Sequence, residues 1–248
     1  DHVVDLNLLE LSREHLANDA ITTIGLLSID DPTGYGIAEI DADCRIKRFR
    51  EKPGPGEIFS NLASTGIYAC DPAIFDHIPA GEKFDFARNL FPDLMEEGYV
   101  LKGWPVRGNW SDVGNPRSLR EAERWKLQGI SFTSISGDLA IRGGRILGPV
   151  HIGGFVSIGT NSRVIGPVSI GAGTAIEENV IVGPYTSIGD GCIIKEGAKI
   201  FSSSLYNRVV IGRGTTVSGS IIDNDTVIGN KCSIEHDTVI GPQVVLKN

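Results

Sequence analysis

The sequence has no long hydrophobic run, no excess of positive charge and no closely spaced pair of cysteines. Its apolar stretches fall short of the ~20 residues that a membrane-spanning helix requires, so we expect no membrane partner. The net charge of −8 argues against a nucleic-acid partner, because such binders need a basic face. The four cysteines form no CxxC pair, which predicts free thiols and a cytoplasmic protein.

The composition is that of a globular protein. The 248 residues are 41% hydrophobic and 22% charged, which suits one large domain or two ordinary ones. The chain begins at Asp1 without a methionine or a signal-type apolar segment, so we expect it to be part of a longer protein.

An aliphatic residue recurs every six positions through the second half of the chain. The row starts at Ile146, slips by one residue at Leu205 and slips again at Ile222. A second row of small or β-branched residues lies two positions earlier and includes Cys192 and Cys232. This period predicts a triangular coil of short parallel strands with the aliphatic side chains inside, and the two slips predict tightened corners.

This pattern resembles the left-handed parallel β-helix of hexapeptide-repeat proteins. The resemblance covers about the last hundred residues, and we assign 131–248 to the β-helix. The left-handed sense of the β-helix is implied by the resemblance and does not follow from the six-residue spacing. Because stacked coils present flat sides and ends, we expect a homo-oligomer that assembles through the β-helix.

The first 130 residues show a mixed pattern of helices and strands. Helices are predicted over 5–18 with Asp5 as the cap, over 85–97 with an interruption at Pro92, and over 116–126. Strands are predicted over 21–28, 64–70 and 101–106, and 35–41 with 45–50 read as a hairpin. Strands that alternate with helices favour an α/β fold with a mostly parallel sheet.

Four short motifs follow one another in this half. They are Asp31-Pro-Thr-Gly-Tyr-Gly36, Glu51-Lys52-Pro53, Ser64-Thr-Gly-Ile-Tyr68 and Gly108-Asn-Trp-Ser-Asp-Val-Gly114. Their order and spacing resemble the sugar-1-phosphate nucleotidylyltransferase family, and the start of the chain at Asp1 resembles that family's Gly-Asp metal motif. The resemblance implies that 1–130 is the sugar-phosphate side of a partial Rossmann-like catalytic domain with a mixed sheet.

The family resemblance also implies a reaction and a set of site residues. A sugar 1-phosphate attacks the α-phosphate of a nucleoside triphosphate and releases pyrophosphate, so catalysis is mainly positioning and charge neutralisation. We expect Mg²⁺ on Asp1 and Asp112, since magnesium favours one or two carboxylates. Lys52 and Asp112 are the expected catalytic residues. The residues expected to bind the sugar phosphate are Gly36, Glu51, Lys52, Thr65 and Gly66.

The chain departs from the family pattern in one respect. The glycine-rich loop that wraps the nucleotide phosphates in the family, G-G-x-G-T-R-L-x-P-L-T, does not occur in this sequence. We therefore expect this segment alone to be inactive. Mannose-1-phosphate guanylyltransferase is the member we favour. Thymidylyl-, adenylyl- and uridylyltransferases of glucose 1-phosphate are the alternatives, and Thr65-Gly66 leans toward that group.

Two other functions compete with nucleotidyl transfer. Acyl transfer by the β-helix would need a histidine base beside an inserted loop, and the candidates are His151 and His236. A non-catalytic subunit could use the β-helix to assemble or regulate an active partner. An open reading frame that ends just before Asp1 would favour this third hypothesis.

Overall fold

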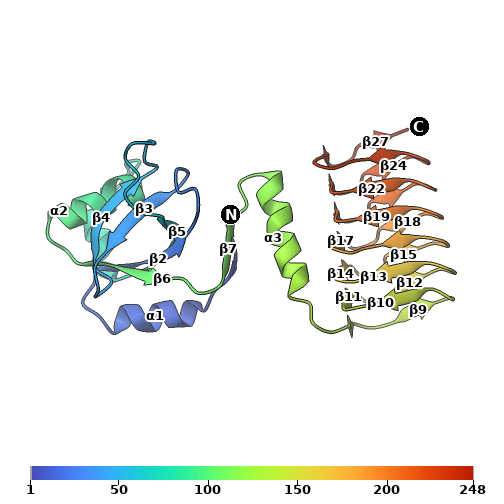
Figure 1. Cartoon of the computed structure of the whole chain (residues 1–248), viewed down its shortest axis with the longest axis horizontal. Coiled ribbons are helices and arrows are strands. Elements are labelled where there is room, and N and C mark those ends of the chain that lie inside the picture. The colour runs from blue at the N-terminus through green and yellow to red at the C-terminus, as the bar shows by residue number, and fades with distance from the viewer. Residues whose placement is uncertain (1, 248) are drawn as a thin grey trace. The chain divides into compact units, whose positions relative to one another are not determined.

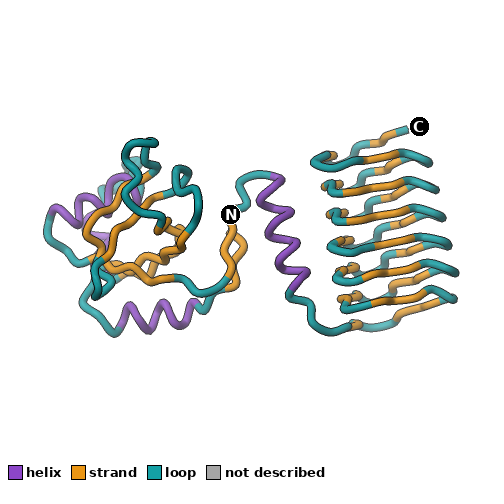
Figure 2. The backbone as a smooth tube through the Cα atoms, in the orientation of Figure 1, coloured by secondary structure: helices purple, strands orange, loops and turns teal. Residues whose placement is uncertain are grey.

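The computed structural model describes residues 2–247, and their contacts divide the chain into two compact units. Val4–Trp110 form one unit, and Ser111–Asn248 with the start of the chain form the other. Figure 1 labels the elements in chain order, and Figure 2 shows short strands throughout the second unit. Within residues 2–247, no helix is long and apolar enough to cross a bilayer.

A five-stranded mixed sheet forms the centre of the first unit, in the order β4-β3-β5-β2-β6. Its strands are β2 (Thr22–Ser28), β3 (Gly36–Ile40), β4 (Ile46–Glu51), β5 (Leu62–Cys70) and β6 (Leu101–Pro105). Only β2 and β6 run parallel, whereas β2–β5, β3–β4 and β3–β5 are antiparallel. The α/β class with a mixed sheet is confirmed. The expectation of a mostly parallel sheet is wrong, because the predicted hairpin and its neighbour β5 contribute antiparallel pairs.

The helices of this unit begin and end close to the predicted places. Helix α1 (Leu8–Leu16) follows Asn7, whose side chain accepts a hydrogen bond from the Glu10 amide. The prediction that Asp5 caps this helix is wrong, because Asp5 is the last residue of β1 (His2–Asp5). Sequence analysis also missed a short 3₁₀-helix, η1 (Pro72–His77).

The helical segment after Asp85 changes type near Pro92. A π-helical turn, η2 (Phe86–Leu90), passes into α2 (Phe91–Glu96), which has Pro92 in its first turn. This confirms the predicted interruption, since proline is tolerated at the start of an α-helix and not in its interior. Phe91 and Leu94 of α2 are fully buried against Ile24 and Leu26 of the sheet. Such side chains each contribute about 1.5–3 kcal/mol on burial.

The second unit contains a parallel β-helix with three sheets. The first comprises β8 (Ser134–Ile135), β11 (Val150–Ile152), β14 (Val168–Ile170), β17 (Thr186–Ile188), β20 (Ser204–Leu205), β23 (Ile221–Ile222) and β26 (Val239–Ile240). The second comprises β9 (Leu139–Ile141), β12 (Val156–Ile158), β15 (Ala175–Ile176), β18 (Ile193–Ile194), β21 (Val210–Ile211), β24 (Val227–Ile228) and β27 (Val245–Leu246). The third comprises β10 (Arg145–Leu147), β13 (Arg163–Ile165), β16 (Ile181–Val182), β19 (Lys199–Phe201), β22 (Thr216–Ser218) and β25 (Ser233–Ile234).

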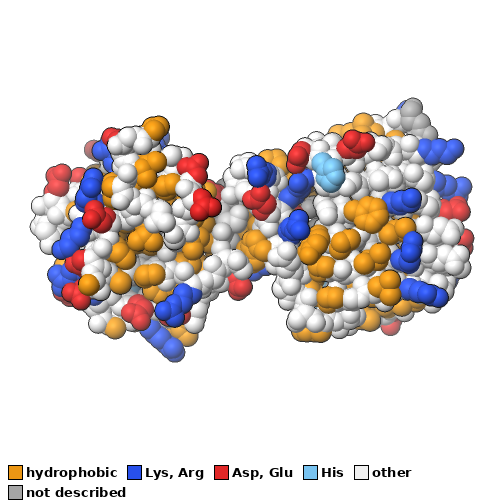
Figure 3. Space-filling view, in the orientation of Figure 1, with side chains coloured by type: hydrophobic (Ala, Val, Ile, Leu, Met, Phe, Trp, Pro, Cys, Tyr) orange, Lys and Arg blue, Asp and Glu red, His pale blue; other side chains and the backbone are white. Residues whose placement is uncertain are grey.

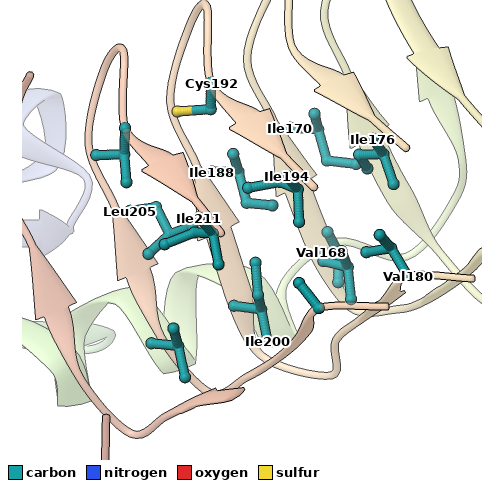
Figure 4. Close-up of a cluster of buried hydrophobic side chains, with 14 of the residues drawn as sticks. Val168, Ile170, Ile176, Val180, Ile188, Cys192, Ile194, Ile200, Leu205 and Ile211 are labelled. Atoms are coloured by element: carbon teal, nitrogen blue, oxygen red, sulfur yellow. The ribbon is translucent and has the colours of Figure 1, made fainter. Parts of the chain in front are cut away.

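The predicted aliphatic row fills the interior of the β-helix. From Ile152 to Ile240 its side chains are at most 9% exposed and form one continuous core, part of which Figure 4 shows. Only the ends of the row are more open, since Ile146 is partly buried and Leu246 is 37% exposed. The inward-facing assignment is therefore confirmed.

The row of small residues also links successive coils through hydrogen bonds. Thr174 donates from its hydroxyl to the carbonyl of Gly189 at 2.8 Å and accepts from the amide of Cys192 at 3.1 Å. Thr215 and Ser220 donate in the same way to Gly229 and Glu235. Because these hydroxyls are buried, each needs such a partner.

The two slips of the repeat shorten two coils by one residue. Ile152 pairs with Ile170 and Ile170 with Ile188, 18 residues apart in each case. Ile188 pairs with Leu205 and Leu205 with Ile222 at a spacing of 17 residues. The spacing from Ile222 to Ile240 returns to 18.

Helix α3 (Pro116–Gln128) belongs to the same compact unit as the β-helix. Asn115 and Ser118 form a reciprocal capping box at its start, which stabilises the first turn. Glu123 accepts hydrogen bonds from the hydroxyls of Ser187 and Ser204, on β17 and β20. These bonds dock α3 on the first sheet of the β-helix.

Candidate functional site

The open end of the β3–β4 hairpin brings three predicted sugar-phosphate residues together. Gly36 pairs with Glu51 across the two strands, and the amide of Lys52 donates to the carbonyl of Tyr35 at 3.0 Å. A Cβ added at Gly36 would lie 2.7 Å from the Phe49 ring and 2.8 Å from the Glu51 carboxylate. Glycine at this position therefore leaves room for that carboxylate.

Lys52 adopts a backbone conformation that favours glycine. Its φ is 44°, in the left-handed region, where a residue with a side chain stores about 1–3 kcal/mol of strain. The side chain is exposed, and the following Pro53 is buried. Such strain is kept where the surrounding structure fixes the backbone, and here the fixed backbone puts an exposed lysine at the open end of the hairpin.

Thr65 and Gly66 form an irregular point on β5. The Thr65 hydroxyl is buried and donates to the carbonyl of Gly25 at 3.0 Å, where the pairing of β2 with β5 shifts register. Gly66 has a φ of 72°, a conformation that only glycine adopts without strain. Bulges of this kind redirect the backbone beside functional sites.

Trp110 links these two groups of residues. Its indole nitrogen donates to the carbonyl of Thr65 at 3.0 Å, and its ring packs edge-on against Tyr35 with centroids 5.3 Å apart. Tyr35 in turn accepts the amide hydrogen bond of Lys52. These contacts show that Trp110 positions both edges of the candidate site.

Charged and aromatic residues that sequence analysis missed surround Glu51. The charges of Asp85 and Arg88 both influence the pKa of Glu51. Asp85 also caps η2, because its carboxylate accepts hydrogen bonds from the amides of Ala87 and Arg88. Tyr68 hydrogen-bonds to Ser64 and stacks on Phe86 with centroids 5.9 Å apart. The motif Ser64–Tyr68 was noted, but nothing in the sequence connects Asp85 with Glu51 across more than thirty residues.

The surroundings of Glu51 shift the pKa of its carboxyl group in opposite directions. Partial burial raises the pKa of Glu51, and the cations of Lys52 and Arg88 oppose that rise. Burial likewise raises the pKa of Tyr68, whose hydroxyl stays protonated at neutral pH. A half-buried carboxylate, a phenol and an ammonium group together can accept from sugar hydroxyls and neutralise a phosphate.

Asp112 lies in the other compact unit, at the end of β7 (Asn109–Asp112). β7 pairs with β1, and Gly108 before β7 abuts Asp5 at the end of β1, so the two strands run in opposite directions. This arrangement places the start of β1 opposite the end of β7, where Asp112 is. Asp1, the other predicted metal ligand, lies outside the described residues.

The carboxylate of Asp112 suits a cation in charge and accessibility. It is partly exposed, and within residues 2–247 no hydrogen bond or ion pair occupies it. The same residues contain no cluster of three or more His, Cys, Asp or Glu side chains fit to hold a metal. A magnesium site with one or two carboxylates, completed by phosphate and water, is compatible with both observations.

The remaining candidate groups of the sequence do not form a site. All four cysteines are free thiols, as predicted. His151 and His236, the candidate bases for acyl transfer, are exposed on separate coils of the β-helix. The His236 ring lies 3.4 Å from the Ser218 hydroxyl, and the His151 ring packs at a tilt against the Phe132 ring. We interpret both contacts as structural.

Comparison with known proteins supports the motif analysis. Residues 1–129 match the family model for nucleotidyl transferases, and residues 164–248 match the model of the GMPPB C-terminal domain. The chain therefore belongs to the nucleotidyl transferase family.

Curated relatives align with part of the chain. A UTP–glucose-1-phosphate uridylyltransferase of Synechocystis is 30% identical over 64% of this chain and 45% of its own length. A glucose-1-phosphate adenylyltransferase of Bacillus cytotoxicus is 31% identical over 55% of this chain and 38% of its own length. The nucleotidyltransferase Agl11 of Haloferax volcanii, named for low-salt glycan biosynthesis, is 30% identical over 58% of this chain and 42% of its length. The chain thus spans less than half of each of these relatives.

Proposed function

We propose that this protein acts as a sugar-1-phosphate nucleotidylyltransferase that makes a nucleotide sugar and releases pyrophosphate. Mannose 1-phosphate and GTP are the proposed substrates, on the motif resemblance of Glu51–Pro53 and Gly108–Pro116. The observation that carries the proposal is the convergence of Gly36, Glu51, Lys52, Thr65 and Gly66 around the Tyr35–Trp110 contact.

The residues of the first unit would bind and orient the sugar phosphate. Glu51 accepts hydrogen bonds from adjacent sugar hydroxyls, and Lys52 places a positive charge beside the phosphate. Gly36 and Gly66 let the backbone approach the sugar closely. Positioning of this kind, which removes the entropy cost of bringing two reactants together, supplies a large share of the rate enhancement.

In the reaction, a phosphate oxygen of the sugar 1-phosphate attacks the α-phosphorus of the nucleoside triphosphate. The new phosphorus–oxygen bond forms as the bond to the β-phosphate oxygen breaks, and pyrophosphate leaves with that electron pair. Bound magnesium would neutralise the phosphate charges. Asp112, together with Asp1, is the proposed holder of that ion. The Asp112 carboxylate has no hydrogen-bond or ion-pair partner among residues 2–247, which supports this role.

A substrate panel tests the proposal. The gene product, expressed with any coding sequence that precedes Asp1, is given magnesium and each pairing of GTP, UTP, ATP or TTP with mannose 1-phosphate or glucose 1-phosphate. We expect pyrophosphate release to be fastest with GTP and mannose 1-phosphate. Faster release with a glucose 1-phosphate pairing would reassign the substrate, and no release with any pairing would contradict the catalytic proposal.

A further inference from the structure

The β-helix has three outer faces, one for each of its sheets. On each face the outward side chains stack in a column, because neighbouring strands pair in register. Helix α3 docks on the first face, where Glu123 accepts hydrogen bonds from Ser187 and Ser204. The column of the third face begins with Arg145 and Arg163 on adjacent strands. Two copies of that face would therefore bring like charges together.

The second face has an apolar column that is open to solvent. Five consecutive strands each contribute one outward residue to it, in the order Ala175, Ile193, Val210, Val227 and Val245. Ile193 is 40% exposed and Val245 is 59% exposed, and the other three are partly exposed. We call this column the apolar stripe. Single exposed apolar residues are common, but a continuous column of them is typical of an interaction surface.

Charged side chains at the corner that follows this face are sorted by sign. Glu178 and Glu196 follow β15 and β18, whereas Arg213 and Lys231 follow β21 and β24. All four are exposed, and none of them forms an ion pair within residues 2–247. Lys195, beside Glu196, is the exception to the sorting and is partly buried. Figure 3 shows basic and acidic side chains along the right-hand edge of the β-helix.

A two-fold axis between β18 and β21 would bring these opposite charges together. Such an axis lies in the plane of the face and reverses the direction of the second β-helix. It exchanges β18 with β21 and β15 with β24. Glu196 would then meet Arg213 of the partner subunit, and Glu178 would meet Lys231 of the partner subunit. Complementary charges of this kind fix the register of two surfaces.

The corner that precedes the face fits the same axis. Asp190 precedes β18 and Arg208 precedes β21, so the axis would bring each beside the other. Arg208 also pairs with Asp225 in its own chain at 2.6 Å, and its guanidinium has further donors. A parallel arrangement would instead put Arg208 opposite Arg213 of the partner subunit. Charge therefore favours the antiparallel arrangement.

We propose that the second face of the β-helix binds a second copy of this chain in an antiparallel two-fold dimer. The apolar stripe then packs against itself, with Ile193 against Val210 of the partner subunit. Because neighbouring strands are ~4.8 Å apart, the stripe is about 19 Å long. Stable dimers bury about 800 Å² per partner, which is more than a stripe of this length supplies. We therefore expect a weak, salt-sensitive dimer that adds little to the unfolding free energy in dilute protein.

Sedimentation velocity of the full gene product, over a wide range of protein concentration, tests the dimer. We expect a monomer in dilute protein and a dimer in concentrated protein, with weaker association at high salt. Val210→Asp puts a charge in the middle of the stripe and should raise the dissociation constant about tenfold or more. Ile181→Asp is the matched control and should dimerise normally, because Ile181 is an outward, partly exposed residue of the third face.

An exchange of charges tests the antiparallel arrangement. Glu196→Lys and Arg213→Glu should each weaken the dimer about threefold or more, since each puts like charges together across the axis. The double variant restores opposite charges and should recover most of the affinity. Both residues are exposed, so these variants test the interface even if Val210→Asp does not fold. The melting temperature of every variant shows which of them are folded.

Three results would overturn the proposal. The first is a monomer at every concentration. The second is a dimer that survives Val210→Asp in folded protein, or one that Ile181→Asp weakens equally, because the second face would then not be the interface. The third is a double variant that associates no better than the single ones, which would refute the antiparallel arrangement. None of these results depends on nucleotidyl transfer, so they leave the proposed function to its own test.

Discussion

The two compact units obey different structural rules. In the β-helix each residue is placed by its position in a six-residue period, and the nearest coils supply nearly all of its partners. In the first unit, neighbours in space such as Glu51 and Asp85 come from distant parts of the chain. In the β-helix, a slip of the repeat by one residue therefore only shortens one coil. The first unit depends instead on contacts between distant residues, which no local sequence pattern predicts.

The comparison also shows where each unit carries chemistry. The first unit places its candidate groups at irregular points, namely the strained turn at Lys52 and the bulge at Thr65-Gly66. The β-helix is regular through most of its length, and its period is broken where two coils lose one residue each. In the first unit, departure from the regular pattern therefore marks the place where the candidate site residues lie.

The largest effect is expected from a substitution in the interior of the β-helix, compared with the same substitution at the next residue. Ile194 and Ile193 are neighbours in β18, and they are 0% and 40% exposed. Ile194→Asp should cost more than about 4 kcal/mol of unfolding free energy, since it buries an unpaired charge. Ile193→Asp should cost less than about 1 kcal/mol. Urea unfolding followed by circular dichroism measures both, and equal losses would refute the inward and outward assignment.

An intermediate effect is expected at the strained turn of the first unit. Lys52→Gly relieves the positive φ, which should stabilise the unit by about 1 kcal/mol after the entropy cost of glycine is subtracted. The same change removes the ammonium group, so KM for the sugar 1-phosphate should rise about tenfold or more. Lys52→Gln is the control that loses the charge and keeps the strain. If Lys52→Gly neither stabilises the protein nor raises KM, strain and function are not linked at this turn.

The smallest effect concerns the buried acid that docks α3. Burial raises the pKa of Glu123 above its ordinary value of 4.5, despite the bonds from Ser204 and Ser187 and the nearby Arg120. The folded state then binds more protons than the unfolded state between those two pKa values, so stability falls as pH rises through that window. Glu123→Gln keeps the hydrogen-bonding shape and should flatten this part of the stability–pH curve. A curve that keeps its slope in the variant would assign the pH dependence to another group.

The sequence allowed most of the β-helix to be predicted and less of the first unit. Its interior rows, the coils shortened at Leu205 and Ile222 and the buried position of Cys192 follow from one repeated spacing. In the first unit the strands and the interruption at Pro92 were predicted, but the sheet directions were not. Strand pairing depends on long-range packing, which periodicity does not report.

The candidate site shows the same limit of prediction from sequence motifs. The motifs pointed to Glu51, Lys52 and Thr65, but Tyr68, Asp85 and Arg88 beside Glu51 join the site only through the fold. The docking of α3 also joins distant residues, since Glu123 hydrogen-bonds to Ser187 and Ser204, which lie 64 and 81 positions further along the chain.

The most direct test of the account is the magnesium-dependent release of pyrophosphate by an Asp112→Asn variant of the full gene product. The side chain keeps its shape and loses the charge that would hold the ion, so the rate should fall about a hundredfold or more. Asp138→Asn, an exposed carboxylate in the same unit, should leave the rate unchanged. A rate equal to that of the unmodified protein at every magnesium concentration would contradict the role assigned to Asp112, and with it the proposed metal site.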